Sequence, residues 1–259
     1  MSAVRQYAVL QRDAVSPTAE QLKRAFRLFH NLTDADAVRL ASSASGILVR
    51  HENHDAARAL LQAVQAEGIN AVLVAEDQLP VLPEAKTLHR LEMSSPSLML
   101  FDVLGHRTTL PWTDLELIVA GTVRQLEFSR TRTERTELRF SPVTGVWPRI
   151  VEETGTKSQS QWHLVLELFA SGATTRYQID AGRFPFNAVM DQPLLSLGEK
   201  FGWLVGEICR RTPWAVLNRG ARSLQAGHAV TEYLNRQMLT DEVTWLLWHT
   251  QQQKRAGRA

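Results

Sequence analysis

Apolar residues recur along this chain with two different periods, and the first third follows the helical one. Three short apolar runs predict strands at Tyr7–Gln11, Gly46–Val49 and Ile69–Val74. Between these runs, apolar residues spaced three and four apart predict three amphipathic helices. Their members are Leu22, Ala25, Phe26 and Phe29 in the first helix, Ala37, Val38 and Ala41 in the second, and Ala57, Leu60, Leu61 and Val64 in the third. The predicted order is therefore strand, helix, helix, strand, helix, strand.

Residues that start and stop helices stand at the ends of these stripes. Pro17 occupies a first-turn position, where a backbone N–H would have no partner within the helix, so its absence costs nothing. Thr33 predicts the start of the second helix, with Asp36 in the capping-box position. Asn53 predicts the N-cap of the third helix, and Gly68 predicts its end.

After Pro80 the hydrophobic period changes from the helical one to two, which predicts a domain boundary between Pro80 and Thr87. Seven short strands are expected next, and then one amphipathic helix with Phe201 at the start of its apolar stripe. The strands are Leu88–Met93, Leu98–Val103, Arg107–Leu110, Leu115–Val123, Trp162–Phe169, Thr175–Ile179 and Phe184–Val189. This order predicts a β-sandwich with a capping helix.

Two further parts complete the predicted organisation. Arg130–Gln161 alternates arginine with glutamate and contains the flexible stretch Gly155–Ser160, so we interpret it as a solvated insertion between two strands. Beyond the sandwich, Val230–Met238 and a last helix capped by Thr240 predict a helical extension, followed by a basic tail. The predicted fold class is α+β, with domains at 1–80 and 87–212, an insertion at 130–161, and an extension at 213–259.

The first domain resembles the C-terminal domain of the bacterial ribosomal stalk protein and the related adaptor proteins of the Clp protease. The resemblance lies between Leu32 and Ala75, in the helix Asp34–Ser42, the strand entered through Ser45-Gly46, and the helix that begins Asp55-Ala-Ala-Arg-Ala-Leu-Leu. It implies a fold that belongs to protein-binding modules more often than to enzymes, and it indicates fold far better than function. The stalk domain offers a Lys-rich, Gly-rich helical hairpin to translation factors, and here Asn31-Leu32-Thr33 replaces its Gly-Leu-Gly linker.

The second domain resembles bacterial members of the pleckstrin-homology-like superfold. The passage Phe-Asp-Val-Leu-Gly-His-Arg-Thr-Thr-Leu-Pro-Trp-Thr-Asp-Leu, at 101–115, carries the resemblance. It implies a seven-stranded sandwich with one open corner that the helix closes. Lipid-binding members carry Lys and Arg in the first hairpin loop, whereas Met93–Ser97 has no cation, so phosphoinositide binding is not implied.

Composition narrows the function. The formal net charge of +2 comes from 29 basic and 27 acidic residues, a balance that does not favour nucleic acid as a partner. No apolar run approaches the ~18–20 residues that a membrane span needs. The N-terminus has no signal-peptide pattern, and the single cysteine, Cys209, lies in an apolar helical pattern. A cytoplasmic protein is therefore expected.

The chain lacks a recognisable catalytic constellation. His51 and His54 have a spacing that can chelate a metal on a helix, but Asn53 caps the helix between them, so a solvated turn is favoured over a metal site. No nucleophile motif or phosphate-binding loop is present, and Cys209 has no base that the sequence identifies. We therefore expect no catalytic residues, no metal and no cofactor, and an enzyme ranks third among the functions considered.

Two basic clusters and two tryptophans are candidates for binding a partner. Each has a plain alternative: a solvated face for the helix cluster, a self-paired ribbon for the arginine run, and intramolecular docking for the tryptophans. The candidates are Lys23, Arg24, Arg27, Arg130, Arg132, Arg135, Trp245 and Trp248. The expected function is a non-catalytic protein–protein adaptor or scaffold with an unidentified protein partner, and a homodimer through the last helix is an option. The alternative is a sensor of a small molecule or lipid headgroup in the open end of the sandwich.

Overall fold

The structure is a computed structural model that describes the backbone of residues 5–13, 17–30, 46–141, 145–189 and 195–257. Within these residues the protein mixes α-helices and β-strands in two sheets, which confirms the α+β class at that level. Contacts divide the chain into two compact units, residues 1–123 with 163–259 and residues 124–162. The expected domain boundary between Pro80 and Thr87 falls inside the first unit, where the next strand already begins at Ala85.

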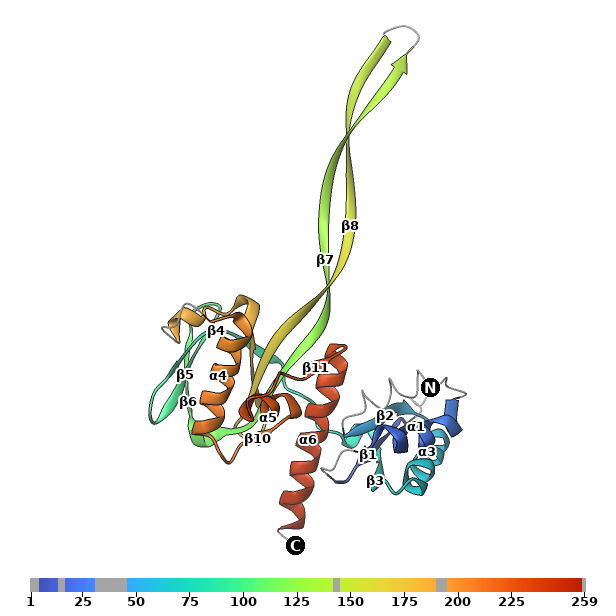
Figure 1. The fold of residues 1–259 in the computed structure, drawn as a ribbon, viewed down its shortest axis with the longest axis vertical. Coiled ribbons are helices and arrows are strands. Elements are labelled where there is room, and N and C mark those ends of the chain that lie inside the picture. Colours follow the sequence, from blue (N-terminus) through green and yellow to red (C-terminus); the bar gives the residue numbers. More distant parts are fainter. Residues whose placement is uncertain (1–4, 14–16, 31–45, 142–144, 190–194, 258–259) are drawn as a thin grey trace. The chain divides into compact units, whose positions relative to one another are not determined.

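The N-terminal part is a small sheet with helices on one face (Figure 1). Its elements are β1 (Tyr7–Gln11), α1 (Ala19–His30), β2 (Ile47–Glu52), α3 (His54–Ala66) and β3 (Ala71–Ala75), followed by the 3₁₀ turn η1 (Glu76–Gln78). In the described part of the chain the strand order is β2-β1-β3, with β1 antiparallel to both neighbours. The predicted helix that begins at Thr33 lies within 31–45, outside the described residues.

Local signals explain the boundaries of α3. The side chain of Asn53 accepts a hydrogen bond from the backbone N–H of Ala56, as an N-cap does. Gly68 follows the helix with φ +77°, a left-handed conformation that glycine adopts without strain. Both predictions from the sequence are confirmed.

Both faces of the N-terminal sheet are buried. Val9 and Leu48 face α1 and α3 and share a core with Leu22, Ala25, Phe26, Ala57, Leu60 and Val64. Alternate residues of the same strands, Ala8 and Leu10, belong to a second core. That core includes the C-terminal helix, so this sheet needs a segment from the far end of the chain to complete its packing.

The larger sheet holds the remaining strands. Its members are β4 (Ala85–Met93), β5 (Ser97–Asp102), β6 (Arg107–Pro111), β7 (Leu115–Ser141), β8 (Gly145–Ala170), β9 (Thr175–Asp180), β10 (Val216–Leu217) and β11 (Glu232–Tyr233). Among the described residues the order is β10-β7-β8-β9-β4-β5-β6, and β11 also pairs with β7. Short 3₁₀ turns lie at η2 (Trp112–Asp114), η3 (Ala181–Arg183) and η4 (Phe186–Ala188).

Helix α4 (Leu197–Arg211) covers the core of this sheet. Phe201, Leu204, Val205 and Ile208 are fully buried there, as their spacing predicts. Ser196 and Glu199 form a reciprocal capping box that fixes the first turn. The two hydrogen bonds between Ser196 and Glu199 fix the start of α4 at Leu197.

The expected seventh strand, Phe184–Val189, is not a strand. These residues form a turn that contains η4. Phe184 and Phe186 are nevertheless buried in the main core, with their rings 5.2 Å apart. Burial of two alternate aromatic residues produced the strand-like pattern without any backbone pairing.

The insertion predicted at 130–161 lies within the second compact unit, residues 124–162, but its backbone differs from the expected flexible segment. The backbone of this stretch is not an irregular loop between strands, because β7 runs to Ser141 and β8 begins at Gly145. The two strands are neighbours in the sheet order. The stretch from Arg130 to Thr136 places a β-branched threonine at every second or third position, which favours extended structure over a flexible linker.

The C-terminal part contains α5 (Arg219–Gln225) and α6 (Arg236–Ala256). Asn235 caps α6, so Thr240 is an interior residue and not the cap that we expected. Likewise, the predicted helix at Val230–Met238 gives way to β11 and the first turn of α6. The helix also continues through residues 251–256, which are too polar to extend the apolar stripe.

A buried polar network fixes this part to β7. The Asn218 side chain accepts the N–H of Ala120 and donates to the Ala120 carbonyl, at 2.9 and 3.0 Å, and also donates to the Tyr233 hydroxyl. That hydroxyl donates to the carboxylate of Glu242 at 2.6 Å. Burial and the neighbouring carboxylate raise the pKa of Tyr233, so the phenol keeps its proton.

Candidate functional site

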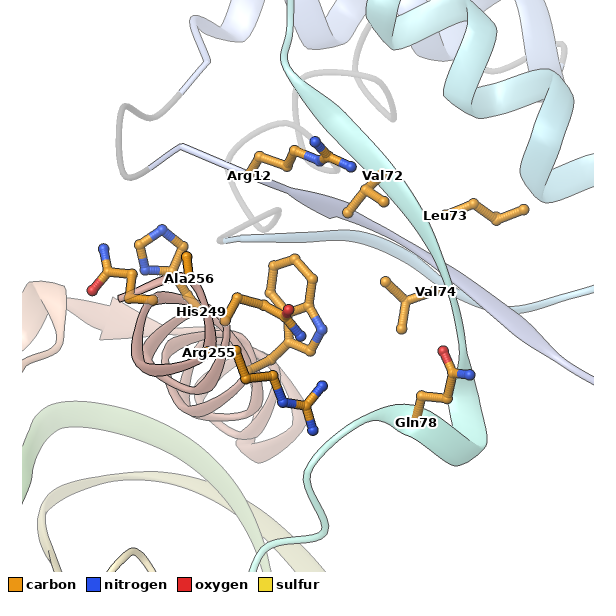
Figure 2. Close-up of a pocket in the computed structure, with 11 residues that line it drawn as sticks. Arg12, Val72, Leu73, Val74, Gln78, His249, Arg255 and Ala256 are labelled. Carbon is orange, nitrogen blue, oxygen red and sulfur yellow. The ribbon is translucent and has the colours of Figure 1, made fainter. Parts of the chain in front are cut away.

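A cavity of about 860 Å³ lies between β3 and the C-terminal half of α6 (Figure 2). It is lined by Arg12, Val72, Leu73, Val74, Gln78, Trp248, His249, Gln252, Gln253, Arg255 and Ala256. One wall is therefore a strand, and the other is the surface of a helix.

The strand wall is an open sheet edge. In the described part of the chain, β3 pairs with β1 alone. The N–H of Arg12 donates to the carbonyl of Asn70 at 2.9 Å, just before β3 begins. Bonded and non-bonded pairs alternate along an antiparallel ladder, so Val72 and Val74 turn their backbone groups toward β1. Leu73, between them, turns its N–H and C=O to the open edge.

Part of this edge is already occupied. The side-chain amide of Gln65 donates to the carbonyl of Ala71 at 3.1 Å. The open length therefore runs from Leu73 to Ala75. This is room for the backbone of one short extended segment, which would complete hydrogen bonds that the sheet leaves unmade.

Side chains of β3 divide between two faces. Val72 and Val74 lie toward α6 and pack on the core that contains this helix, whereas Leu73 points the other way (Figure 2). A segment paired with β3 would follow the same alternation, because successive side chains of a strand point to opposite faces. Every second residue of that segment would face α6.

The helix wall is rigidly held by the residues that precede it. Trp245 is 7% exposed, and its indole N–H donates to the carbonyl of Gln11 at 2.8 Å. Gly46 makes this packing possible, since a Cβ there would lie 2.1 Å from Cδ2 of Trp245. One turn further along, Trp248 is 8% exposed and lines the cavity. The cavity wall is thus an extension of a packed interface and not a loose surface.

An ion cluster adds a second link between α6 and the N-terminal sheet. Arg50 bonds to the carboxylate of Glu76 at 2.7 Å and to that of Asp241 at 2.8 Å. Burial alone raises the pKa of Glu76, but hydrogen bonds from Arg50 and from the N–H of His51 outweigh burial and leave this pKa lowered. Glu76 is therefore held ionised at neutral pH, and through Arg50 the cluster links β2 to α6.

The charge at the cavity is positive. Arg12 and Arg255 are exposed, and neither forms an ion pair with any residue that the structure describes. No acidic side chain belongs to the residues that line the cavity. Gln252 and Gln253 add amide groups that accept and donate hydrogen bonds.

A second cavity, of about 450 Å³, lies where β4 passes from β9 to β5. Its polar residues include Lys86, Asp102, His106 and Tyr177. The Nζ atom of Lys86 stands 5.8 Å from the centre of the Tyr177 ring. His106 Nδ1 lies 2.9 Å from the carboxylate of Asp102, which closes the β5–β6 turn. A small-molecule sensor, the alternative that the sequence left open, would need a cavity of this kind.

Two buried carboxylates elsewhere serve packing. Glu167 is 1% exposed and is paired with Arg176, at 2.8 Å, and with Arg236. Glu242 is 2% exposed and accepts from Tyr233 and from Arg219. Each has its charge compensated inside the fold, so neither is placed as an acid or base for a substrate.

The basic residues expected on α1 lie away from the cavity. Helix α1 covers the opposite face of the N-terminal sheet from α6. Arg24 pairs with Glu67 at 2.6 Å, Lys23 is half-buried, and Arg27 is exposed. Arg130, Arg132 and Arg135 belong to β7, at positions whose side chains lie outside the described residues.

The two candidate tryptophans have different surroundings. Trp245 packs inside the chain, so intramolecular docking accounts for it, and it is not an exposed anchor for a second copy. Trp248 is also buried, but it borders the cavity. The sequence reasoning did not single out Arg12, Val72 or Arg255 as site residues. The continuous apolar run through β3, with no polar alternation, was the available signal, because such a strand is covered on both faces.

Comparison with protein-family models, with curated proteins and with solved structures found no match. Among the described residues, no group of three or more His, Cys, Asp and Glu side chains is arranged to hold a metal ion. Helices in that same part of the chain are too short or too polar to span a membrane.

Proposed function

We propose that this protein is a non-catalytic adaptor that captures an extended segment of a partner protein as an added strand on β3. The observation that carries the proposal is the outward N–H and C=O of Leu73, at an open edge that borders a cavity large enough for such a segment. Addition of a strand to a sheet edge is a general mode of peptide recognition, in which backbone hydrogen bonds supply affinity and flanking pockets supply specificity.

Finer features of fold and location belong to the same proposal. A stalk-domain-like β-α-α-β-α-β module would present the edge, and a pleckstrin-homology-like sandwich capped by α4 would support α6. The apolar residues of α4, buried in the core of the larger sheet, support the second assignment. A reducing compartment such as the cytoplasm suits the buried thiol of Cys209, whose pKa burial raises to about 11.

A proline substitution tests the proposal. Leu73→Pro removes the outward N–H while leaving the pairing of Val72 and Val74 with β1, and edge strands tolerate proline at such positions. Leu73→Val is the matched control, because it also shortens the side chain but keeps the N–H. Short random peptides would be selected by display on the wild-type protein, and their affinities measured by fluorescence anisotropy.

We expect Leu73→Pro to weaken the selected peptides by about tenfold or more, through one lost hydrogen bond and the bulk of the ring at the edge. Leu73→Val should stay within about threefold of the wild type, which is less than one hydrogen bond is worth. Equal binding by the proline and valine variants would refute strand addition. Failure to recover any peptide from the selection would refute it as well.

The second cavity supports one rival function, a sensor of a small anionic or aromatic molecule beside Lys86 and Tyr177. Thermal shift against a metabolite collection, with Tyr177→Phe and Lys86→Gln as variants, tests it. A ligand that stabilises the wild type and neither variant would favour the sensor over the adaptor.

A further inference from the structure

We infer that the segment bound on β3 is acidic, with carboxylate side chains at alternate positions that face α6. This inference rests on the proposed strand addition and names the chemistry of the partner. It follows from the positions of Arg12 and Arg255 in the cavity between β3 and α6, here called the groove. These positions are compared with the edge of β3 on which the segment would pair.

The cations lie on one side of the open edge. Arg12 directly follows β1 and is paired through its backbone with Asn70, which places it beside the start of β3. Arg255 lies in the last turn of α6. Both side chains are on the α6 side of the sheet, beside Val72 and Val74 (Figure 2).

The alternation of a strand then selects which partner residues meet these cations. Side chains of an added segment that face α6 would cross Val72, Val74 and Trp248 before reaching the guanidinium groups. Glutamate suits this path, because its methylene groups can lie on apolar surface while its carboxylate remains at the polar rim. Side chains on the other face would lie beside Leu73 and have no cation to meet among the lining residues.

Lys254, the residue next to Arg255, already has an acidic partner. Lys254 is paired with Glu116 at 3.1 Å, outside the cavity lining. Arg12 and Arg255 have no such partner among the described residues, so a bound carboxylate would be the first to compensate them. Guanidinium groups favour carboxylates because two N–H groups can bond to both oxygens.

Charge also argues against a second copy of this chain as the occupant. Antiparallel pairing of two β3 edges would bring Arg12 and Arg255 of each copy to the same interface, and like charges placed across an interface disfavour association. An acidic segment reverses the sign of that interaction. The groove therefore fits an acidic extended peptide better than its own duplicate.

The experiment uses the peptides recovered by display on the full-length protein. A parallel selection is run on the Arg12→Gln, Arg255→Gln double variant. A matched control, Lys23→Gln with Arg27→Gln, makes the same change in net charge on α1, which covers the other face of the sheet.

We expect Asp and Glu to be enriched at alternate positions in peptides from the wild type and from the α1 control, and not in those from the groove variant. Replacing the two acidic residues of a recovered peptide by glutamine should weaken wild-type binding about fivefold or more, because two exposed ion pairs are lost. The same replacement should have no effect on the groove variant. Raising the salt concentration should reduce the difference.

The outcomes separate this inference from the proposed function. Peptides that lack acidic enrichment but lose binding in Leu73→Pro would overturn the acidic partner and leave strand addition standing. Acidic peptides that bind the groove variant as tightly as the wild type would also overturn it. Displacement of the peptides by an equal concentration of single-stranded oligonucleotide would reassign the cations to phosphate.

Discussion

The contact between Gly46 and Trp245 gives the sharpest test of how the two ends of this chain are joined. An alanine at position 46 would suffer two separate penalties. Its φ of +80° is left-handed, which costs a residue with a Cβ about 1–2 kcal/mol. Its Cβ would also lie 2.1 Å from the indole ring of Trp245, and overpacking of this kind costs about 1–3 kcal/mol more.

Gly68 is a matched control, because an alanine there would suffer the backbone penalty without the steric one. It has nearly the same φ, +77°, and nothing lies within 4 Å of the position its Cβ would take. Gly68→Ala should therefore lower the free energy of unfolding by the backbone penalty alone, about 1–2 kcal/mol. Gly46→Ala should cost about 2–5 kcal/mol, the sum of both terms.

A double-mutant cycle assigns the difference to the indole ring. Truncation of a buried tryptophan to alanine lowers the free energy of unfolding by about 3–5 kcal/mol. Trp245→Leu removes less of the side chain and should cost less than that. In that background Gly46→Ala should cost only the backbone penalty, which gives a coupling free energy of about 1–3 kcal/mol. Urea denaturation followed by circular dichroism measures each corner of the cycle. Additivity within about 0.5 kcal/mol would refute the proposed packing of α6 on the N-terminal sheet.

Four further results follow from the described contacts. Because the pKa of Glu76 is held below its ordinary 4.5, the free energy of unfolding should fall as the pH drops through that region, and Glu76→Gln should flatten the dependence; an unchanged acid limb would contradict this. The thiol of Cys209 should resist a disulfide reagent at pH 8 until urea unfolds the chain, and rapid native labelling would show that it is not buried. Asn218→Ala should cost about 3 kcal/mol or more, because α5 loses its N-cap and both backbone groups of Ala120 lose their partners; a change below about 1 kcal/mol would mean that water replaces the amide. A fragment of residues 1–85 should bind a hydrophobic dye that the full chain excludes, since its sheet lacks α6, and a dye-silent fragment with a cooperative thermal transition would contradict that reasoning.

Sequence reasoning located most elements of the N-terminal part because their signals are local. Asn53 and Gly68 act on the turns beside them, and the stripe of α3 is read from its own residues. The same holds for α4, where spacing and the Ser196 cap agree. These features need no knowledge of the rest of the fold.

Sequence reasoning did not find what the far face of the N-terminal sheet packs against. The run Tyr7–Gln11 predicts a strand but not which segment covers Ala8 and Leu10, whose side chains pack in the core that contains α6. For Trp245 and Trp248 on α6, the sequence left open a partner interface or docking inside the chain, without indicating which surface the helix would cover. Their wide apolar arc is the pattern of a helix buried on two sides, since the same core also contains Val119 and Phe169 of the larger sheet.

The candidate site escaped prediction for a related reason. An open edge depends on which strands pair, and the order β2-β1-β3 cannot be deduced from the apolar runs alone. Arg12 and Arg255 are separated by nearly the whole sequence, and only the packing of α6 brings them to one groove. Short-range patterns contain no information about such a pairing.

The placement of α6 has a consequence for how this protein is made. Ribosomes deliver the N-terminal sheet first, and small domains usually fold as they emerge. Here one face of β1, with Ala8 and Leu10, stays uncovered until translation has reached Trp245 and the helix that carries it. During that interval the edge of β3 and the apolar face beside it are both accessible, so the nascent chain is most vulnerable to mispairing just before α6 packs on the sheet.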